Sequence, residues 1–95
     1  DIISGIPSSW PGYDLAIGSS GEKVSQLQNE LNVIATAYPG IPLLAVDGIY
    51  GQETAESVRV FQKIFNIEET GIVDFQTWYK ISQIYVGVSR IAEYN

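Results

Sequence analysis

Two segments of the chain follow one template: Gly48-Ile49-Tyr50-Gly51-Gln52-Glu53-Thr54 and Gly71-Ile72-Val73-Asp74-Phe75-Gln76-Thr77. In both, a threonine lies six residues after the first glycine, and apolar residues follow four and seven positions after that threonine. Glycine readily adopts positive φ, so each segment predicts a tight loop that leads into a helix. Two copies are too few for a solenoid, which needs at least about three repeats. The pattern therefore predicts one compact domain with internal pseudo-symmetry.

Apolar periodicity predicts three helices around these loops. The first follows Ser19-Ser20-Gly21-Glu22, which has the form of a capping box with Ser19 as N-cap, and ends at Pro39-Gly40. The second is expected from Gln52 to about Phe65, with Asn66 as a C-cap. The positions expected to face the core are Val24, Leu27, Leu31, Ile34 and Tyr38 in the first helix, and Ala55, Val58, Phe61, Ile64 and Phe65 in the second.

Asp74 is a strong N-cap candidate for the third helix, which we expect to run to about residue 92. Gly87 and its β-branched neighbours weaken the pattern and favour a bend or a break near residue 86. Residues 41–46 contain Pro42, so they predict an extended connection rather than a helix. The apolar face of the third helix is formed by Trp78, Ile81, Ile84, Tyr85, Val88 and Ile91.

Residues 1–17 are punctuated by proline and glycine and predict an extended N-terminal arm ahead of the domain, which spans residues 18–95. The arm carries apolar residues, including Ile2, Ile3 and Ile6, so we expect it to lie across the domain and cover part of the core. An alternative is that Trp10 and Tyr13 are exposed aromatics that bind a ligand.

The composition excludes several classes of function. A chain of 95 residues with 45% hydrophobic residues is one globular domain. It has no cysteine and no histidine, which removes thiolate catalysis, Ser-His triads and the common zinc sites. A net charge of −6 disfavours nucleic acid and anionic membranes as partners, and no apolar run is long enough to span a membrane. We expect neither a metal nor a cofactor.

Paired carboxylates are the remaining enzymatic option, because glycosidases place two acids across a cleft. Asp47 and Asp74 lie in neighbouring positions of the two loops. A structural role is favoured for both: Asp47 orders its loop through a bond to the backbone, and Asp74 caps a helix. We therefore expect no catalytic residue. The loop-forming residues are Asp47, Gly48, Gly51, Gly71 and Asp74.

Aromatic and amide side chains around the two loops are better candidates for a binding site, because sugar rings stack on aromatic faces and polar neighbours fix their orientation. The alternative for each aromatic residue is a place in the core. Gln62 follows Phe61 and is expected to bond a loop backbone rather than a ligand. The candidate ligand-binding residues are Tyr50, Gln52, Thr54, Arg59, Phe75 and Trp78.

Taken in order, these motifs resemble the bacterial peptidoglycan-binding domain family over residues 18–85. The resemblance rests on Gly18-Ser19-Ser20-Gly21 with Val24, Leu27-Gln28 and Leu31; on Asp47-Gly48-Ile49-Tyr50-Gly51 with Thr54, Val58 and Phe61-Gln62; and on Gly71-Ile72-Val73 with Thr77-Trp78. The chain departs from the family at Asp74-Phe75, where Gly-Pro is frequent. Phe75 is therefore expected to be an exposed residue peculiar to this protein.

The resemblance implies an all-α fold, a closed three-helix bundle. It also implies a non-catalytic module that binds peptidoglycan or muropeptides and holds other domains of its parent chain, such as a hydrolase, at the cell wall. Such a module would be extracellular, on a vegetative or a spore wall. An alternative is a protein-interaction or assembly module that reuses the same fold. The fold also serves as the pro-domain of matrix metalloproteinases, but that role needs a cysteine, which this chain lacks.

Overall fold

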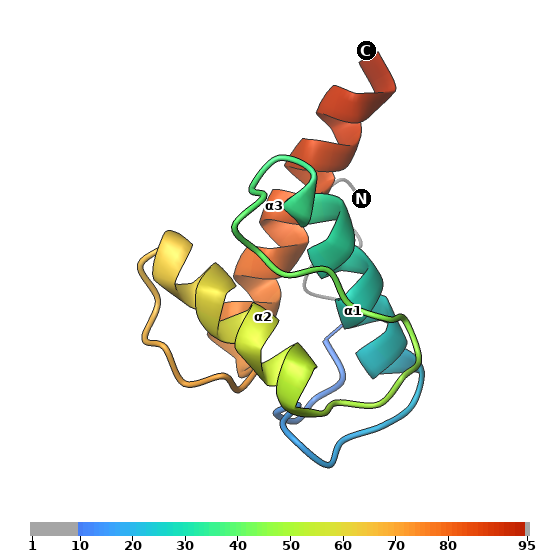
Figure 1. Cartoon of the computed structure of the whole chain (residues 1–95), viewed down its shortest axis with the longest axis vertical. Coiled ribbons are helices and arrows are strands. Elements are labelled where there is room, and N and C mark those ends of the chain that lie inside the picture. The colour runs from blue at the N-terminus through green and yellow to red at the C-terminus, as the bar shows by residue number, and fades with distance from the viewer. Residues whose placement is uncertain (1–9, 95) are drawn as a thin grey trace.

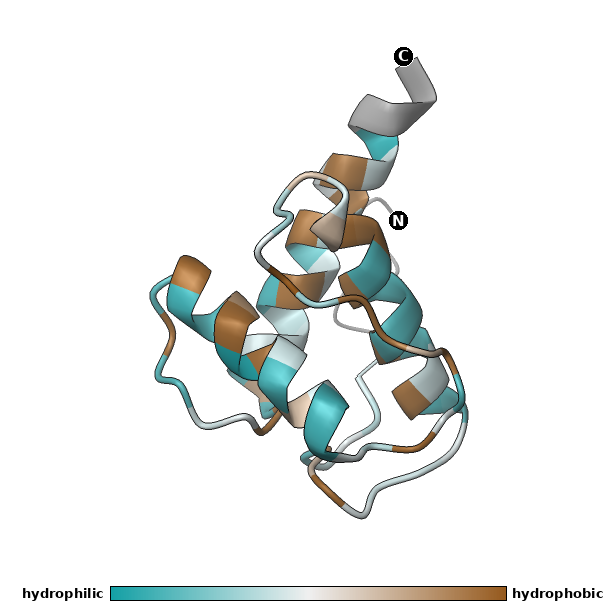
Figure 2. Ribbon diagram, viewed as in Figure 1, coloured by the Kyte–Doolittle hydropathy of each residue, from teal (hydrophilic) through white to brown (hydrophobic). Residues whose placement is uncertain are grey.

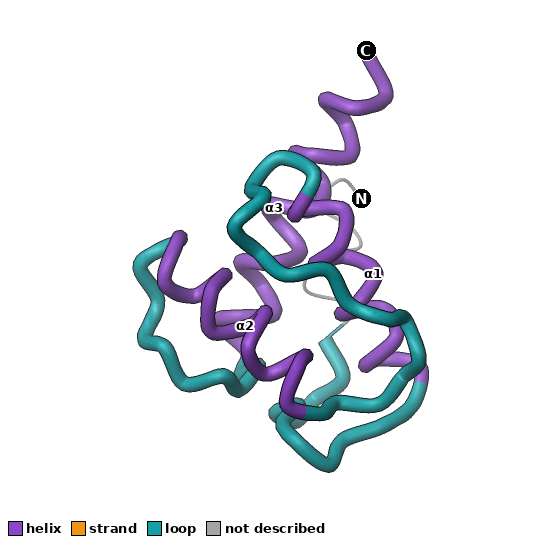
Figure 3. Tube along the Cα trace, in the orientation of Figure 1, coloured by secondary structure: helices purple, strands orange, loops and turns teal. Residues whose placement is uncertain are grey.

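The computed structural model of the chain describes residues 10–94, with the side chains described as far as residue 90. Within that range the chain forms three helices: α1 (Glu22–Ala35), α2 (Gln52–Ile64) and α3 (Phe75–Tyr94) (Figure 1). The rest of the described chain consists of loops and two isolated β-bridges, with no strand (Figure 3). α1 packs more closely against α3 than against α2. The expectation of an all-α, three-helix fold is confirmed.

The core lies between the three helices and contains most of the apolar positions expected from the periodicity. Figure 2 shows that apolar and polar segments alternate along each helix, as amphipathic packing requires. The expectation for Ile64 is wrong, because its side chain is 38% exposed. α2 ends at Ile64, and Phe65 packs against Phe61 and Tyr38 instead, with ring centroids 4.6 and 5.0 Å apart. The buried apolar residues that the helices contribute are Val24, Leu27, Leu31, Ile34, Ala35, Ala55, Val58, Phe61, Trp78 and Ile81.

The predicted capping box at Ser19 is wrong. α1 begins at Glu22 after Gly21, and no side chain caps its first turn. The backbone of Ser19 instead pairs with the first loop, because its carbonyl accepts the Tyr50 N–H at 3.0 Å. Its hydroxyl accepts the Ala16 N–H at 3.0 Å. Pairing of this segment with the loop therefore overrides the local capping signal.

The expected end of α2 and the expected start of α3 are confirmed, whereas α1 ends at Ala35 rather than at Pro39-Gly40. Asn66 has a φ of 59°, the left-handed conformation that ends α2. The Ile67 N–H returns to the Gln62 carbonyl at 2.8 Å, which is the long bond of a Schellman motif. Asp74 caps α3 by accepting the Thr77 N–H at 2.9 Å. The expected break near residue 86 is wrong, because α3 is continuous from Phe75 to Tyr94.

Gln28 of α1 is buried and holds the first loop. Its carbonyl oxygen accepts the backbone N–H groups of Asp47 and Gly48 at 3.0 and 2.9 Å. Its amide nitrogen lies 2.9 Å from the Ile49 carbonyl and 3.1 Å from the Thr54 hydroxyl. One side chain thus satisfies backbone donors and acceptors of a loop that, within the described residues, is not part of any strand.

Gln62 of α2 holds the second loop in the same way. Its carbonyl oxygen accepts the N–H groups of Thr70 and Gly71, both at 2.9 Å, and its amide nitrogen reaches the Ile72 carbonyl at 3.0 Å. The expected bond from Gln62 to a loop backbone is confirmed. The repeating unit therefore also includes the helix that precedes each loop. Its equivalent pairs are Gln28 and Gln62, Asp47 and Thr70, Gly48 and Gly71, Ile49 and Ile72, and Thr54 and Thr77.

The described part of the arm covers one side of the core. Leu15 is 1% exposed and forms an antiparallel bridge with Val73. Trp10 packs edge-on against Trp78 and Phe75, at 5.9 and 5.6 Å between ring centroids, whereas Tyr13 is exposed. The predictions for Ile2, Ile3, Ile6 and Ile91 lie outside the described residues and side chains. The division into arm and domain at residue 18 stays a prediction.

Replacing Gln62 with methionine tests whether the buried amide stabilises the fold. Methionine has a similar length but cannot bond the loop, so the N–H groups of Thr70 and Gly71 lose their partner. We expect a loss of about 3 kcal/mol in the free energy of unfolding, measured by urea denaturation. The matched control is Gln76→Met at an exposed position of α3, where the change should stay within about 0.5 kcal/mol. Equal stabilities of the two variants would contradict the assignment.

Candidate functional site

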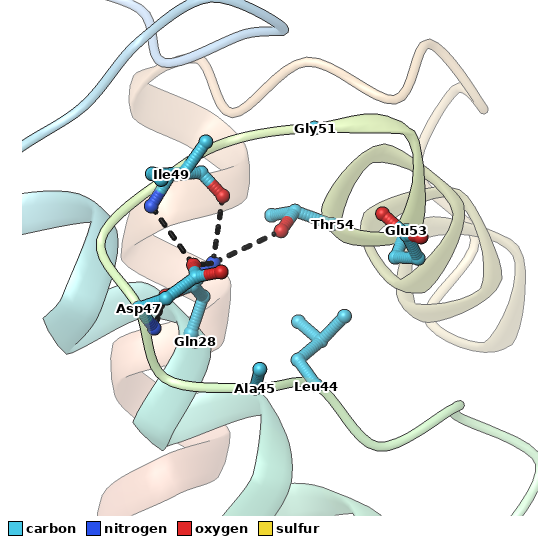
Figure 4. Close-up of a pocket in the computed structure, with 8 residues that line it drawn as sticks. All are labelled: Gln28, Leu44, Ala45, Asp47, Ile49, Gly51, Glu53 and Thr54. Atoms are coloured by element: carbon cyan, nitrogen blue, oxygen red, sulfur yellow. Dashed lines mark hydrogen bonds between the residues drawn. The ribbon is translucent and has the colours of Figure 1, made fainter.

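A pocket of about 280 Å³ opens beside the first loop. It lies between α1, the segment that leads into the loop, and the first turn of α2 (Figure 4). In Figure 4, Glu53 and Leu44 lie across the opening from Asp47 and Gln28. The described residues that line it are Gln28, Leu44, Ala45, Asp47, Ile49, Gly51, Glu53 and Thr54.

Side chains from two helices hold the connection that forms one wall of this pocket. Asn32 of α1 pairs with both backbone groups of Leu44, at 2.8 Å each. Ser57 of α2 donates to the Pro42 carbonyl at 2.8 Å. The expected extended connection at 41–46 is confirmed, and these bonds hold its backbone against the domain. The pocket is therefore formed by ordered backbone.

Asp47 orders the first loop, as expected from the sequence. Its carboxylate accepts the Ile49 N–H at 3.0 Å and the Gln28 amide at 3.1 Å. These two bonds lower the pKa of the Asp47 carboxyl below its ordinary value, and the bond from the Ile49 backbone has the larger effect. Asp47 is exposed at the pocket and stays ionised at neutral pH.

Glycine is required at the turn of each loop. Gly48 and Gly71 both have a φ of 74°. A Cβ atom on Gly48 would lie 3.2 Å from the Gly21 carbonyl oxygen, and one on Gly71 would lie 2.8 Å from an Arg59 guanidinium nitrogen. Gly51 does not use this freedom: its φ is −109°, because it occupies the extended N-cap position of α2.

Three of the candidate ligand-binding residues are buried, at 1% exposure for Tyr50, 2% for Thr54 and 1% for Trp78. Tyr50 donates to the Gly71 carbonyl at 2.6 Å and so joins the two loops, and its burial raises the pKa of its hydroxyl. Trp78 packs beneath Trp10 in the core. Tyr50 and Trp78 do not line the pocket, and their burial argues against direct ligand contact. Thr54 lines it while bonded to Gln28.

The other three candidates are more exposed but do not share one groove. Gln52 is exposed between two residues that line the pocket. Arg59 lies over Gly71 and pairs with Glu56 at 2.9 Å. Phe75 is 50% exposed and stacks on Tyr79, with ring centroids 6.1 Å apart. Neither Arg59 nor Phe75 lines the pocket, so the predicted site divides between two surfaces.

Sequence reasoning missed the apolar and acidic walls of the pocket, namely Leu44, Ala45, Ile49 and Glu53, and it assigned no role to Gln28. One signal was available for Gln28, because Leu27-Gln28 repeats the pattern of Phe61-Gln62. Ile49 belongs to the first loop motif, but nothing in the sequence indicates that its side chain is 61% exposed. Among the residues that the structure describes, no group of three or more acidic side chains could hold a metal ion.

A family model described as a putative peptidoglycan binding domain matches residues 20–81, which is more than half of the chain. The chain belongs to this family. It is 39% identical over 77 residues to a zinc D-Ala-D-Ala carboxypeptidase of Streptomyces albus G, covering 80% of this chain but only 28% of that protein. The chain thus spans about a quarter of the length of this curated relative.

Two solved structures are similar to this domain. The SleB N-terminal domain superposes with a TM-score of 0.69 at 28% identity, covering 80% of this chain and 97% of that one. A peptidoglycan-binding protein from Clostridioides difficile, solved in complex with glutamine hydroxamate, gives 0.64 at 26% identity over 76% of this chain and 42% of that one.

Membership of this family makes the domain a non-catalytic, peptidoglycan-binding module that associates with the cell wall. The resemblance stated from the sequence is therefore confirmed, together with the three-helix fold that it implied. Across the described residues, none of the helices is both long and apolar enough to cross a membrane.

The pKa of Asp47 predicts how stability depends on pH. A carboxyl whose pKa is lower in the folded state than its unfolded value of about 3.9 stabilises the fold above that pH. This contribution disappears as the pH falls through the folded pKa. Asp47→Asn should therefore be less stable than the parent at pH 7, and the difference should shrink towards pH 2 in thermal unfolding experiments. Asp14→Asn, at an exposed aspartate of the arm, is the control. A difference that is independent of pH would contradict this assignment.

Proposed function

We propose that the pocket beside the first loop is where this domain contacts peptidoglycan. The observation that carries the proposal is the pocket itself, which combines an exposed apolar residue, Ile49, with polar groups on an ordered loop. Small-ligand sites have this composition, with apolar walls and a few polar groups that fix orientation. Thr54, one of the residues expected from the sequence, lines this pocket, and Gln52 is exposed between two residues that line it.

Ordering of the loop before binding supports this location. Gln28 and Asn32 hold both sides of the pocket through hydrogen bonds to backbone. A ligand that enters a preformed site does not have to order the loop, so less binding free energy is lost. A site of this size still gives weak affinity on its own. Tandem copies would strengthen attachment by raising the effective concentration.

We propose further that the domain keeps other parts of a longer protein, such as a hydrolase, at the extracellular wall. The carboxypeptidase relative supports this, because a domain similar to this chain accounts for 28% of that protein. In such an arrangement the module holds the longer protein at the wall. Chemistry on the wall would belong to the rest of the protein.

Truncating Ile49 tests the location of the site. Ile49→Ala should weaken co-sedimentation with purified peptidoglycan sacculi about five- to tenfold, because an exposed apolar contact is removed. Ile72→Ala is the matched control, since Ile72 occupies the equivalent position of the second loop and is also exposed. It should leave the amount of pelleted protein unchanged.

Two outcomes would contradict this location. Equal loss in both variants would indicate that the effect is on loop stability rather than on binding. Loss in Phe75→Ala with no loss in Ile49→Ala would instead place the ligand on the exposed aromatic pair of α3. A folded parent protein that stays in solution with every wall preparation would contradict peptidoglycan binding by the isolated domain.

A further inference from the structure

The two loops differ in charge at equivalent positions, although the same hydrogen bonds hold both. Asp47 accepts the Ile49 N–H at 3.0 Å, and Thr70 accepts the Ile72 N–H at 3.1 Å in the same place. A neutral threonine thus performs the turn-forming role that Asp47 performs. Glu53 likewise corresponds to Gln76 in the shared template. The fold of this loop therefore does not require a negative charge at either position.

Both of these extra carboxylates line the pocket. Asp47 lies on the loop and Glu53 in the first turn of α2, on opposite sides of the opening in Figure 4. Leu44, Ala45 and Ile49 supply apolar wall between them. Among the described residues that line the pocket there is no aromatic and no basic side chain. A sugar ring has no aromatic face to stack on here, and a carboxylate has no cation to pair with.

The geometry points to an aliphatic amine as the group that this pocket receives: the side chain of the diamino acid in a peptidoglycan stem peptide. This inference rests on the proposed function and names the part of the wall that the pocket recognises. The methylene groups of such a side chain would lie against the apolar wall, and its ammonium group would lie between Asp47 and Glu53. A pocket of about 280 Å³ suits a group the size of one residue rather than a whole disaccharide-peptide.

Charge complementarity supports this occupant over the other parts of the wall. Peptidoglycan is rich in carboxylates, which a protein with a net charge of −6 repels. Free amines are the cationic groups of the polymer. The lowered pKa of Asp47 keeps one side of the pocket anionic at mildly acidic pH as well.

The first test is titration of the isotope-labelled domain by NMR with Nα-acetyl-lysine N-methylamide. We expect shifts of the backbone amides of Ile49, Gly51 and Glu53 that saturate in the millimolar range. The same compound acetylated on its ε-amine should produce none. Glucosamine separates the two sources of amine in the wall. If it shifts these amides as strongly as the lysine derivative, the assignment to the stem peptide is overturned.

The second test compares native sacculi with sacculi whose free amines have been acetylated. We expect acetylation to weaken pelleting about three- to tenfold, which is the range for one or two exposed ion pairs. The double variant Asp47→Thr/Glu53→Gln copies the second loop into the first and should show the same loss while remaining folded. Glu68→Gln/Glu69→Gln removes the same charge from exposed positions outside the pocket, and should bind like the parent.

The outcomes distinguish this inference from the proposed function. Equal pelleting of the parent with native and acetylated walls would overturn the amine assignment and leave peptidoglycan binding intact. Pelleting with neither wall would contradict the proposed function, and the inference with it. If Asp47→Thr disturbs the loop, the single variant Glu53→Gln decides the question. The Glu53 side chain takes part in none of the hydrogen bonds between the loop and Gln28. Full binding by Glu53→Gln to native walls would then count against the amine.

Discussion

The structure depends on two buried amides, those of Gln28 and Gln62. Loops that pass close to a core must satisfy their backbone groups, and in the described chain no strand is present to do so. A glutamine side chain offers an acceptor and two donors, so one residue on a helix can hold the N–H and carbonyl groups of a whole turn. The position of each loop, and of everything mounted on it, is thereby tied to one helix. The exposed Ile49 can stand out from such a loop because its backbone is already satisfied.

Two equivalent units can have different functions when different groups cover them. In the second loop Arg59 lies over Gly71. Backbone pairing does not distinguish the two loops, because Val73 pairs with Leu15 and Tyr50 pairs with Ser19. Beside the first loop, the smaller Ser25 stands in the position of Arg59. The connection held by Asn32 there leaves an opening rather than closing it. The two loops therefore share one hydrogen-bonding scheme, and the pocket beside the first loop arises from the residues around it rather than from that scheme.

Sequence analysis predicted the features that depend on local periodicity and on helix ends. Asp74 and Asn66 act as expected because a cap needs only its own turn, and the helical faces follow from the spacing of apolar residues. It failed where distant segments compete. Ser19 lost its capping role because its backbone pairs with Tyr50, and Tyr50 is buried because its hydroxyl meets a carbonyl 21 residues away in the other loop. Neither partner is visible in a short motif.

The positions of the carboxylates explain how an acidic domain can bind a polymer that is itself rich in carboxylates. A protein of net charge −6 gains nothing from general attraction to a polymer of carboxylates, so its specificity must arise locally. Two of its carboxylates lie at a pocket where the fold does not need them, since Thr70 and Gln76 serve in the equivalent places. Ionised Asp47 adds some stability to its loop, because its pKa is lowered there, but Thr70 makes the equivalent bond to the backbone without a charge. Such a charge is best explained by a cationic group that meets it, while the remaining negative surface weakens contact with the anionic parts of the wall.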